Sequence, residues 1–231
     1  ARPRRRGPPP TRGDPVTDPT TTAAPTTFVV TEQQFDAMFP ERNPFYTYAG
    51  LVAATVAYPA FATSGGDRVA RREAAAFLAQ VSHETHGLEH VVEVSTANYP
   101  HYCDPAQPYG CPAGQDAYYG RGPLQLSWNF NYRAAGEALG IDLLADPWLV
   151  EQDPTVAWQT ALWYWNTQPG TASMTCHDAI VGEHGFAETI RSINGPLECE
   201  GGNPRQMNNR VRLFRHYVEI VGTTTGDHLT C

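Results

Sequence analysis

Residues 81–93, VSHETHGLEHVVE, contain three His and three Glu. Side chains of these types bind metal ions or act as general acids and bases. The zinc-binding pattern HExxH places two His at i and i+4, whereas His83 and His86 are separated by three positions. No Cys or Asp joins His83, His86 and His90 at ligand spacing. We therefore expect no metal site here.

Two of these Glu could instead form an acid–base pair. Glu84 ends an apolar segment predicted to be helical, a partly shielded position that suits a general acid. In one straight helix, Glu93 would lie about 13.5 Å further along the axis and on the opposite face. A break at Gly87 would let the two carboxylates face each other across a cleft, with room for a water as in inverting glycosidases. Glu89 is a third candidate, and a frayed helix end with solvated side chains is the alternative.

A second polar stretch, YYGRGPLQLSWNFNY, covers residues 118–132. In an extended segment, alternate side chains share one side, and here these are Gln125, Ser127, Asn129 and Asn131. Amides, a hydroxyl and interleaved aromatic rings suit a polar, uncharged ligand with apolar ring faces, such as a sugar. The alternative is a loop that packs under a helix, with Trp128 in the core. The stretch ALWYW at residues 161–165 is interpreted as part of a buried helix, and an aromatic platform for sugar binding is the alternative.

Helical periodicity dominates the elements that must position these residues. The predicted helices are 31–40 with Thr31 as N-cap, 44–61, 67–85 with Asp67 as N-cap and Gly87 as the stop, 132–140, 154–167, 185–194 and 206–222. Strand signals are few and short. We therefore predict one mainly α domain over residues 28–231.

Residues 1–27 are rich in Pro, Thr and Arg and have no apolar period. This composition predicts a disordered linker, which could join an upstream carbohydrate-binding module. These residues carry a net charge of +3. Because the whole chain has a net charge of −8, residues 28–231 carry −11. An acidic domain argues against nucleic-acid binding, and no apolar run approaches the roughly 20 residues of a membrane span.

The five Cys include no CxxC pair, which disfavours zinc-ribbon and thioredoxin folds. Cys231 is the last residue, and the simplest role for a terminal Cys is to form a disulfide that secures the end of the chain. That indicates an oxidising compartment and a secreted protein. Because five is odd, one thiol is left over, and we expect it to be Cys176.

Four ordered motifs, FLAQVSHETHG, YYGRGPLQLSWNFNY, SINGPLECEGGNP and NNRVRLFRHYVEIVG, resemble glycoside hydrolase family 19 chitinases. The resemblance covers residues 28–231, and the short loops are similar to the compact bacterial branch. It implies a lysozyme-like, α-rich fold with two lobes, a deep substrate cleft and minor β structure. It also implies disulfides Cys103–Cys111 and Cys199–Cys231.

The resemblance also implies roles for individual residues. Glu84 corresponds to the general acid, Glu93 to the general base, and Ser127 to the residue that helps hold the attacking water. Glu198 and Arg210 correspond to a buried ion pair that supports the cleft. The expected substrate-binding residues are Gln125, Asn131, Asn194, His83, Tyr119 and Trp128. His86 departs from the family pattern, which has Gly or Thr at this position.

The predicted function is therefore an inverting endochitinase that hydrolyses chitin or chito-oligosaccharides without a cofactor, as a monomer. Two alternatives stay open at this point. A lysozyme-type peptidoglycan hydrolase could use the same scaffold, and clearing of cell walls compared with release of chitin oligomers would separate the two. A non-catalytic chitin-binding protein is the second alternative, which an activity assay would test.

Overall fold

The computed structural model describes residues 28–231, which form α-helices and one 3₁₀-helix. The helices are α1 (Glu32–Met38), α2 (Tyr48–Thr55), α3 (Gly66–Thr85), η1 (Thr96–Tyr102), α4 (Asn129–Leu139), α5 (Leu149–Gln152), α6 (Pro154–Thr167), α7 (Cys176–Val181), α8 (Phe186–Glu198) and α9 (Pro204–Val221). The predicted mainly α class is thus confirmed. The predicted linker, residues 1–27, lies outside the described residues.

Several helix ends follow from local hydrogen bonding, and the N-cap at Thr31 is the one that was predicted. The Thr31 hydroxyl accepts from the backbone N–H of Gln34, and the Gln34 side chain accepts from the N–H of Thr31, which completes a capping box. Asp153 caps α6, and Pro154 occupies its first turn, where no backbone N–H is needed. Gly222 ends α9 in the left-handed conformation that glycine adopts without strain.

The ends of α3 differ from the prediction. The N-cap is Gly65, and Asp67 lies inside the first turn, where it pairs with Arg71 at 2.9 Å. At the other end the left-handed C-cap is His86, with φ of 55°, and Gly87 follows with φ of 76°. The Gly87 N–H donates to the Ser82 carbonyl at 2.8 Å, so both positive-φ residues are needed to turn the chain back.

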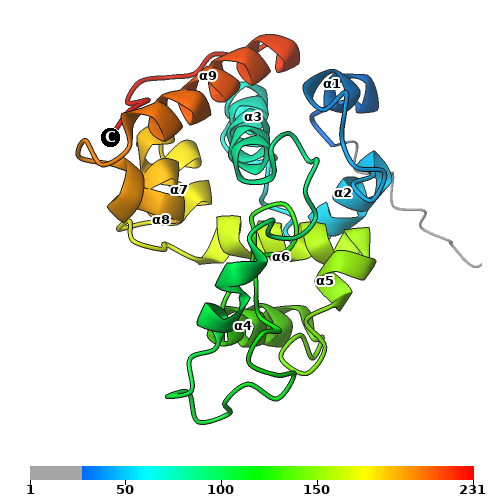
Figure 1. Ribbon diagram of the computed structural model, residues 1–231. Helices are drawn as coiled ribbons and strands as arrows, with labels where there is room; N and C mark the ends of the chain where they lie inside the picture. The colour runs from blue at the N-terminus through cyan, green and yellow to red at the C-terminus, as the bar shows by residue number, and fades with distance from the viewer. Residues whose placement is uncertain (1–27) are drawn as a thin grey trace, which may run out of the picture.

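The helices pack around two hydrophobic cores. The larger core surrounds α3, whose last three turns are almost fully buried, with α9 beside it in Figure 1. The smaller core includes Tyr118, Tyr132, Leu143 and Val150, near α4 and α5. Helix α6 crosses the middle of the molecule and serves both cores, with Trp158 in the larger and Trp163 in the smaller. This arrangement produces two lobes joined by α6.

The segment 125–131 is not the extended strand that its alternation predicted. Gln125 and Trp128 have φ of 51° and 76°, and α4 already begins at Asn129. Asn129 is fully buried, and its amide donates to the carbonyls of Asp104 and Gly110. The side chains of residues 125, 127 and 131 therefore lie on one side while Asn129 points into the core. Turns, rather than strand alternation, set these directions.

Two disulfides have the predicted pairing. Cys103–Cys111 closes the loop after η1, and Cys199–Cys231 joins the end of α8 to the last residue of the chain. Cys176 is the free thiol, as predicted, and it is buried at the start of α7. Burial raises the pKa of Cys176 to about 12, so this thiol stays protonated and packs as a small apolar side chain.

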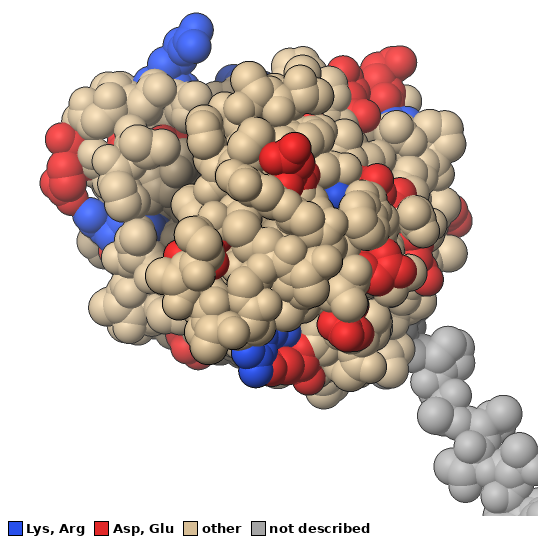
Figure 2. Space-filling model, turned by 60° about the horizontal axis from the view of Figure 1, so that its bottom comes forward, with Lys and Arg blue, Asp and Glu red and all other residues tan. Residues whose placement is uncertain are grey.

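Uncharged side chains cover most of the face shown in Figure 2, with acidic and basic groups scattered among them. The face in Figure 2 shows no continuous basic stripe of the kind typical of nucleic-acid binding. Within residues 28–231, no helix combines the length and apolar character that crossing a membrane would require.

Candidate active site

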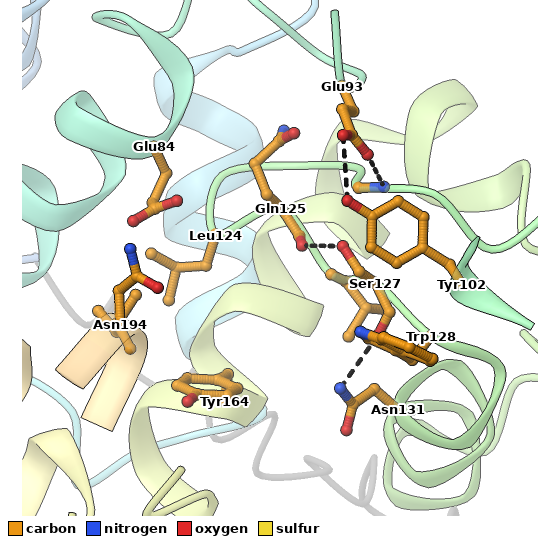
Figure 3. Close-up of a pocket in the computed structure, with 13 residues that line it drawn as sticks. Glu84, Glu93, Tyr102, Leu124, Gln125, Ser127, Trp128, Asn131, Tyr164 and Asn194 are labelled. Atoms are coloured by element: carbon orange, nitrogen blue, oxygen red, sulfur yellow. Dashed lines mark hydrogen bonds between the residues drawn. The ribbon is translucent and has the colours of Figure 1, made fainter. Parts of the chain in front are cut away.

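A cavity of about 510 Å³ lies between the two lobes. Side chains from both lobes line it: Glu84, Glu93, Tyr102, Gly120, Leu124, Gln125, Leu126, Ser127, Trp128, Asn131, Tyr164, Ile193 and Asn194. Figure 3 shows Glu84 on one side of this cavity and Glu93 on the other. The structure thus brings together the two carboxylates that the sequence singled out.

Glu84 projects from the last turn of α3 and keeps 20 % of its side chain exposed. Its Oε1 lies 2.5 Å from Nη2 of Arg210, but the geometry of this contact is not that of a hydrogen bond. Because Oε1 is shielded from solvent, Oε2 is the oxygen available to a ligand in the cavity. One oxygen is thus held by charge and the other is free for chemistry.

Arg210 connects Glu84 to a buried polar network. Its Nε and Nη2 donate to the two oxygens of Glu198 at 2.8 and 2.7 Å, and Nη1 donates to Gln80 at 2.7 Å. Gln80 in turn donates to Thr189 at 2.8 Å. Burial opposes the charge on Glu198, yet the hydrogen bonds and charge of Arg210 prevail and hold its pKa below the ordinary value. The predicted ion pair is present, and it directly supports Glu84.

Asn194 occupies a kink in α8, where its φ of −148° and ψ of 30° interrupt the helix. Its amide donates to Glu198 at 2.7 Å, so the same carboxylate orients both Arg210 and Asn194. The amide oxygen points toward the middle of the cavity, while the amide nitrogen lies nearer to Glu84 (Figure 3). The kink thus directs a polar group from a helix into the cleft.

Glu93 is held by a short antiparallel arrangement of backbone. Its N–H donates to the Gly120 carbonyl at 2.8 Å, and isolated bridges join Val92 to Arg121 and Arg121 to Leu126. These bridges account for the minor β structure that was predicted. They place Glu93 next to the segment that carries Gln125 and Ser127.

Gly120 allows this segment to approach closely. A Cβ at position 120 would lie 2.9 Å from Gln125 Oε1 and 3.3 Å from Ser127 Oγ. The Ser127 hydroxyl donates to the Gln125 carbonyl at 2.8 Å, which leaves its oxygen lone pairs free to accept from a water. Asn131 donates to the Ser127 carbonyl at 3.0 Å, and its side chain lines the cavity.

Gln125 and Trp128 line the cavity with positive φ angles, which residues other than glycine rarely adopt. Each such residue costs on the order of 1–3 kcal/mol, and such positions concentrate at functional sites. Trp128 is 37 % exposed, so its ring remains available as a platform rather than packing in the core.

His83 and Tyr119, two predicted substrate-binding residues, do not line the cavity. His83 lies beside Glu84 in sequence, and its Nδ1 is 3.0 Å from the Asn209 amide nitrogen. Burial, reinforced by the charge of Arg210, lowers the pKa of His83 and favours the neutral ring. Tyr119 stacks on Tyr99 at 3.7 Å and supports the loop that carries Glu93.

Sequence reasoning missed Tyr102 and gave Tyr164 only a secondary role. Tyr164 lines the cavity from α6, and its hydroxyl donates to the Ser192 carbonyl at 2.9 Å. Tyr102 lines it from η1 and donates to Glu93 at 3.0 Å. An aromatic residue directly before Cys103 was the available signal, because a disulfide rigidifies that position.

The site has the parts of an acid–base hydrolase. One carboxyl is available on each side of a cleft, and hydroxyl and amide groups surround them. Among residues 28–231, no three His, Cys, Asp or Glu side chains converge in a way that could hold a metal ion.

Comparison with known proteins identifies relatives of this chain. The family described as chitinase class I, glycoside hydrolase family 19, matches residues 29–231. Endochitinase B of Zea mays is 45 % identical over 192 residues, which cover 83 % of this chain and 64 % of the maize protein. The chain therefore spans slightly less than two thirds of that relative.

Solved structures show the same relationship. Chitinase C from Streptomyces griseus HUT6037 is 66 % identical with a TM-score of 0.88, and the match covers 90 % of this chain and 83 % of that one. The class IV family 19 chitinase of Zea mays is 41 % identical with a TM-score of 0.77, and the match covers 88 % and 98 % of the two chains. Sequence and fold are thus more similar to the bacterial structure than to this plant one.

Proposed function

This chain belongs to the glycoside hydrolase family 19 chitinases, and we propose that its cleft hydrolyses β-1,4-linked N-acetylglucosamine polymers with inversion at the anomeric carbon. The observation that carries this proposal is that Glu84 and Glu93 line one cavity from opposite sides. An inverting mechanism needs this arrangement, because acid and base act on opposite faces of the sugar.

Glu84 acts as the general acid. Its accessible oxygen protonates the glycosidic oxygen while the bond to the anomeric carbon breaks. Arg210 holds the other oxygen at 2.5 Å, so the carboxyl is fixed in place for this transfer. Positioning of this kind lowers the barrier, because little ordering remains to be done during the reaction.

Glu93 acts as the general base. It removes a proton from a water that also donates a hydrogen bond to the Ser127 hydroxyl, and the resulting oxygen attacks the anomeric carbon. Gln125, Asn131 and Asn194 bind the polar groups of the sugars, and Trp128 stacks on a ring face. His83 and Tyr119 contribute from behind the cavity wall, by supporting the segments that carry Glu84 and Glu93.

The substrate is chitin or its soluble oligosaccharides, and the two disulfides support secretion into an oxidising environment. NMR of the first product formed from N-acetylglucosamine hexamer tests the mechanism. We expect the α-anomer to form first, because a single displacement inverts the β linkage. A β-anomer as the first product would overturn the role of Glu93 in activating water.

A further inference from the structure

Both donors that reach the Glu93 side chain from η1 bind the same oxygen. The Asn98 amide donates to Oε1 at 2.6 Å, and the Tyr102 hydroxyl donates to Oε1 at 3.0 Å. The other oxygen, Oε2, has only a long contact of 3.5 Å from the Gly120 N–H. The hydrogen bonding of this carboxylate is therefore strongly unequal between its two oxygens.

Tyr102 is suited to remain a donor under all assay conditions. Burial, together with the hydrogen bond to Glu93, raises the pKa of Tyr102 to about 12. Its ring lines the cavity and meets Trp128 edge-to-face, with centroids 5.6 Å apart. Tyr102 thus connects the carboxylate to the aromatic platform and is fixed at both ends.

We propose that Tyr102 and Asn98 are positioning residues for the base, which occupy Oε1 so that Oε2 is the oxygen that takes the proton from water. This inference rests on the proposed role of Glu93. Two charge-assisted hydrogen bonds fix the rotation of the carboxylate.

The other side chains near η1 contact the backbone of Glu93 or one another, rather than the Glu93 carboxylate. The Tyr99 hydroxyl donates to the backbone carbonyl of Glu93 at 3.0 Å. Its ring stacks on Tyr119, and the Arg121 guanidinium lies 3.6 Å from the centre of the Tyr119 ring. Arg121 pairs with Glu151 at 2.6 Å. The Tyr102 hydroxyl takes part in none of these contacts.

This arrangement supplies a matched pair of variants. Tyr102→Phe removes a hydroxyl that binds the carboxylate, whereas Tyr99→Phe removes a hydroxyl of the same short helix that binds only the Glu93 backbone. Both variants, with Asn98→Ala and Glu93→Gln, are compared with the wild-type protein. The measurements are kcat and KM on N-acetylglucosamine hexamer, the pH dependence of kcat/KM, and thermal unfolding.

We expect Tyr102→Phe and Asn98→Ala each to lower kcat about tenfold with KM nearly unchanged. The acidic limb of the pH profile should move to higher pH, because the ionised carboxylate loses a donor. Tyr99→Phe should lower the melting temperature about as much as Tyr102→Phe does, but it should leave the acidic limb of the pH profile in place. Loss of stability alone would not move the limb, so the two effects are separable even if a variant folds poorly.

Three other outcomes would contradict either the positioning role or the proposed function. If Glu93→Gln is inactive while Tyr102→Phe and Asn98→Ala match the wild-type rate and pH profile, the positioning role is wrong and the base is right. If Tyr99→Phe moves the acidic limb as far as Tyr102→Phe does, η1 acts only through the backbone, and the role is again wrong. If Glu93→Gln keeps wild-type activity, the proposed function itself fails.

Discussion

Arg210 lies 2.5 Å from Glu84 through the same Nη2 nitrogen that donates to the buried Glu198 carboxylate. Glu198 already balances the charge of Arg210, because both of its oxygens accept from the guanidinium. Glu84 can therefore release and regain a proton without leaving Arg210 uncompensated. Glu198 thus provides the charge that stabilises the fold around Arg210, and Glu84 remains free for proton transfer.

Glu84→Gln should lower kcat by about 10²–10⁴-fold, because the amide cannot supply the proton. Oligosaccharide binding should be largely retained, since the substituted side chain has the same shape. Initial rates and calorimetric titration with N-acetylglucosamine hexamer would measure both effects. Glu93→Gln serves as the comparison and should cost less than or about as much as Glu84→Gln. Near-normal turnover by Glu84→Gln would exclude it as the acid.

Arg210→Ala should destabilise the fold by about 3–5 kcal/mol, because it leaves the buried Glu198 carboxylate unpaired. Since the pKa of Glu198 is held low by Arg210, this stabilisation is present above the unfolded carboxyl pKa of about 4.3 and fades as pH falls below it. Urea unfolding of the variant and wild type at pH 7 and pH 3.5 would show the difference shrinking in acid. A difference below about 1 kcal/mol at pH 7 would contradict the role of the pair.

Gly120→Ala should reduce activity more than stability. The added Cβ would displace the ends of the Gln125 and Ser127 side chains, which can move, rather than backbone. We expect kcat to fall about tenfold with a change in unfolding free energy within about 1 kcal/mol. Gly50→Ala is the matched control. Its Cβ would meet Thr47 Oγ1 at 3.0 Å, and neither Gly50 nor Thr47 lines the cavity. Equal activity of the two variants would refute this reading of Gly120.

A second buried carboxylate makes stability depend on pH. Glu73 is fully buried and accepts from the Ala62 N–H, the Trp165 indole and His177, the last at 2.6 Å. The hydrogen bond to Glu73 outweighs burial, and the charges of Glu73 and Asp178 add to it, so the pKa of His177 is raised. The stabilisation is complete below the unfolded value of about 6.5 and is lost as pH rises through the raised value.

The melting temperatures of the wild type and His177→Gln should therefore differ more at pH 5.5 than at pH 9. Differential scanning calorimetry at the two pH values measures this change. His216→Gln, at an exposed position of α9, is the control and should show no such trend. A difference that grows with pH would contradict the assignment of the ionised pair.

Much of the helical framework could be predicted because its determinants are local. The capping box at Thr31, Asp153 before Pro154, and Gly222 all act within one turn of the residues they organise. Where two local solutions competed, prediction failed. Asp67 was expected to cap α3, but Gly65 is the N-cap and Asp67 pairs with Arg71 instead.

The sequence by itself determined the mainly α fold class and the candidate carboxylates. Periodicity and caps act over short distances, while resemblance to a family selected Glu84 and Glu93 among several acidic residues. Only the tertiary structure decided which groups surround them. Arg210 reaches Glu84 from another helix, Tyr102 reaches Glu93 from η1, and Asn129 turns into the core. The reason is physical: long-range hydrogen bonds and burial set side-chain directions that spacing along one segment does not encode.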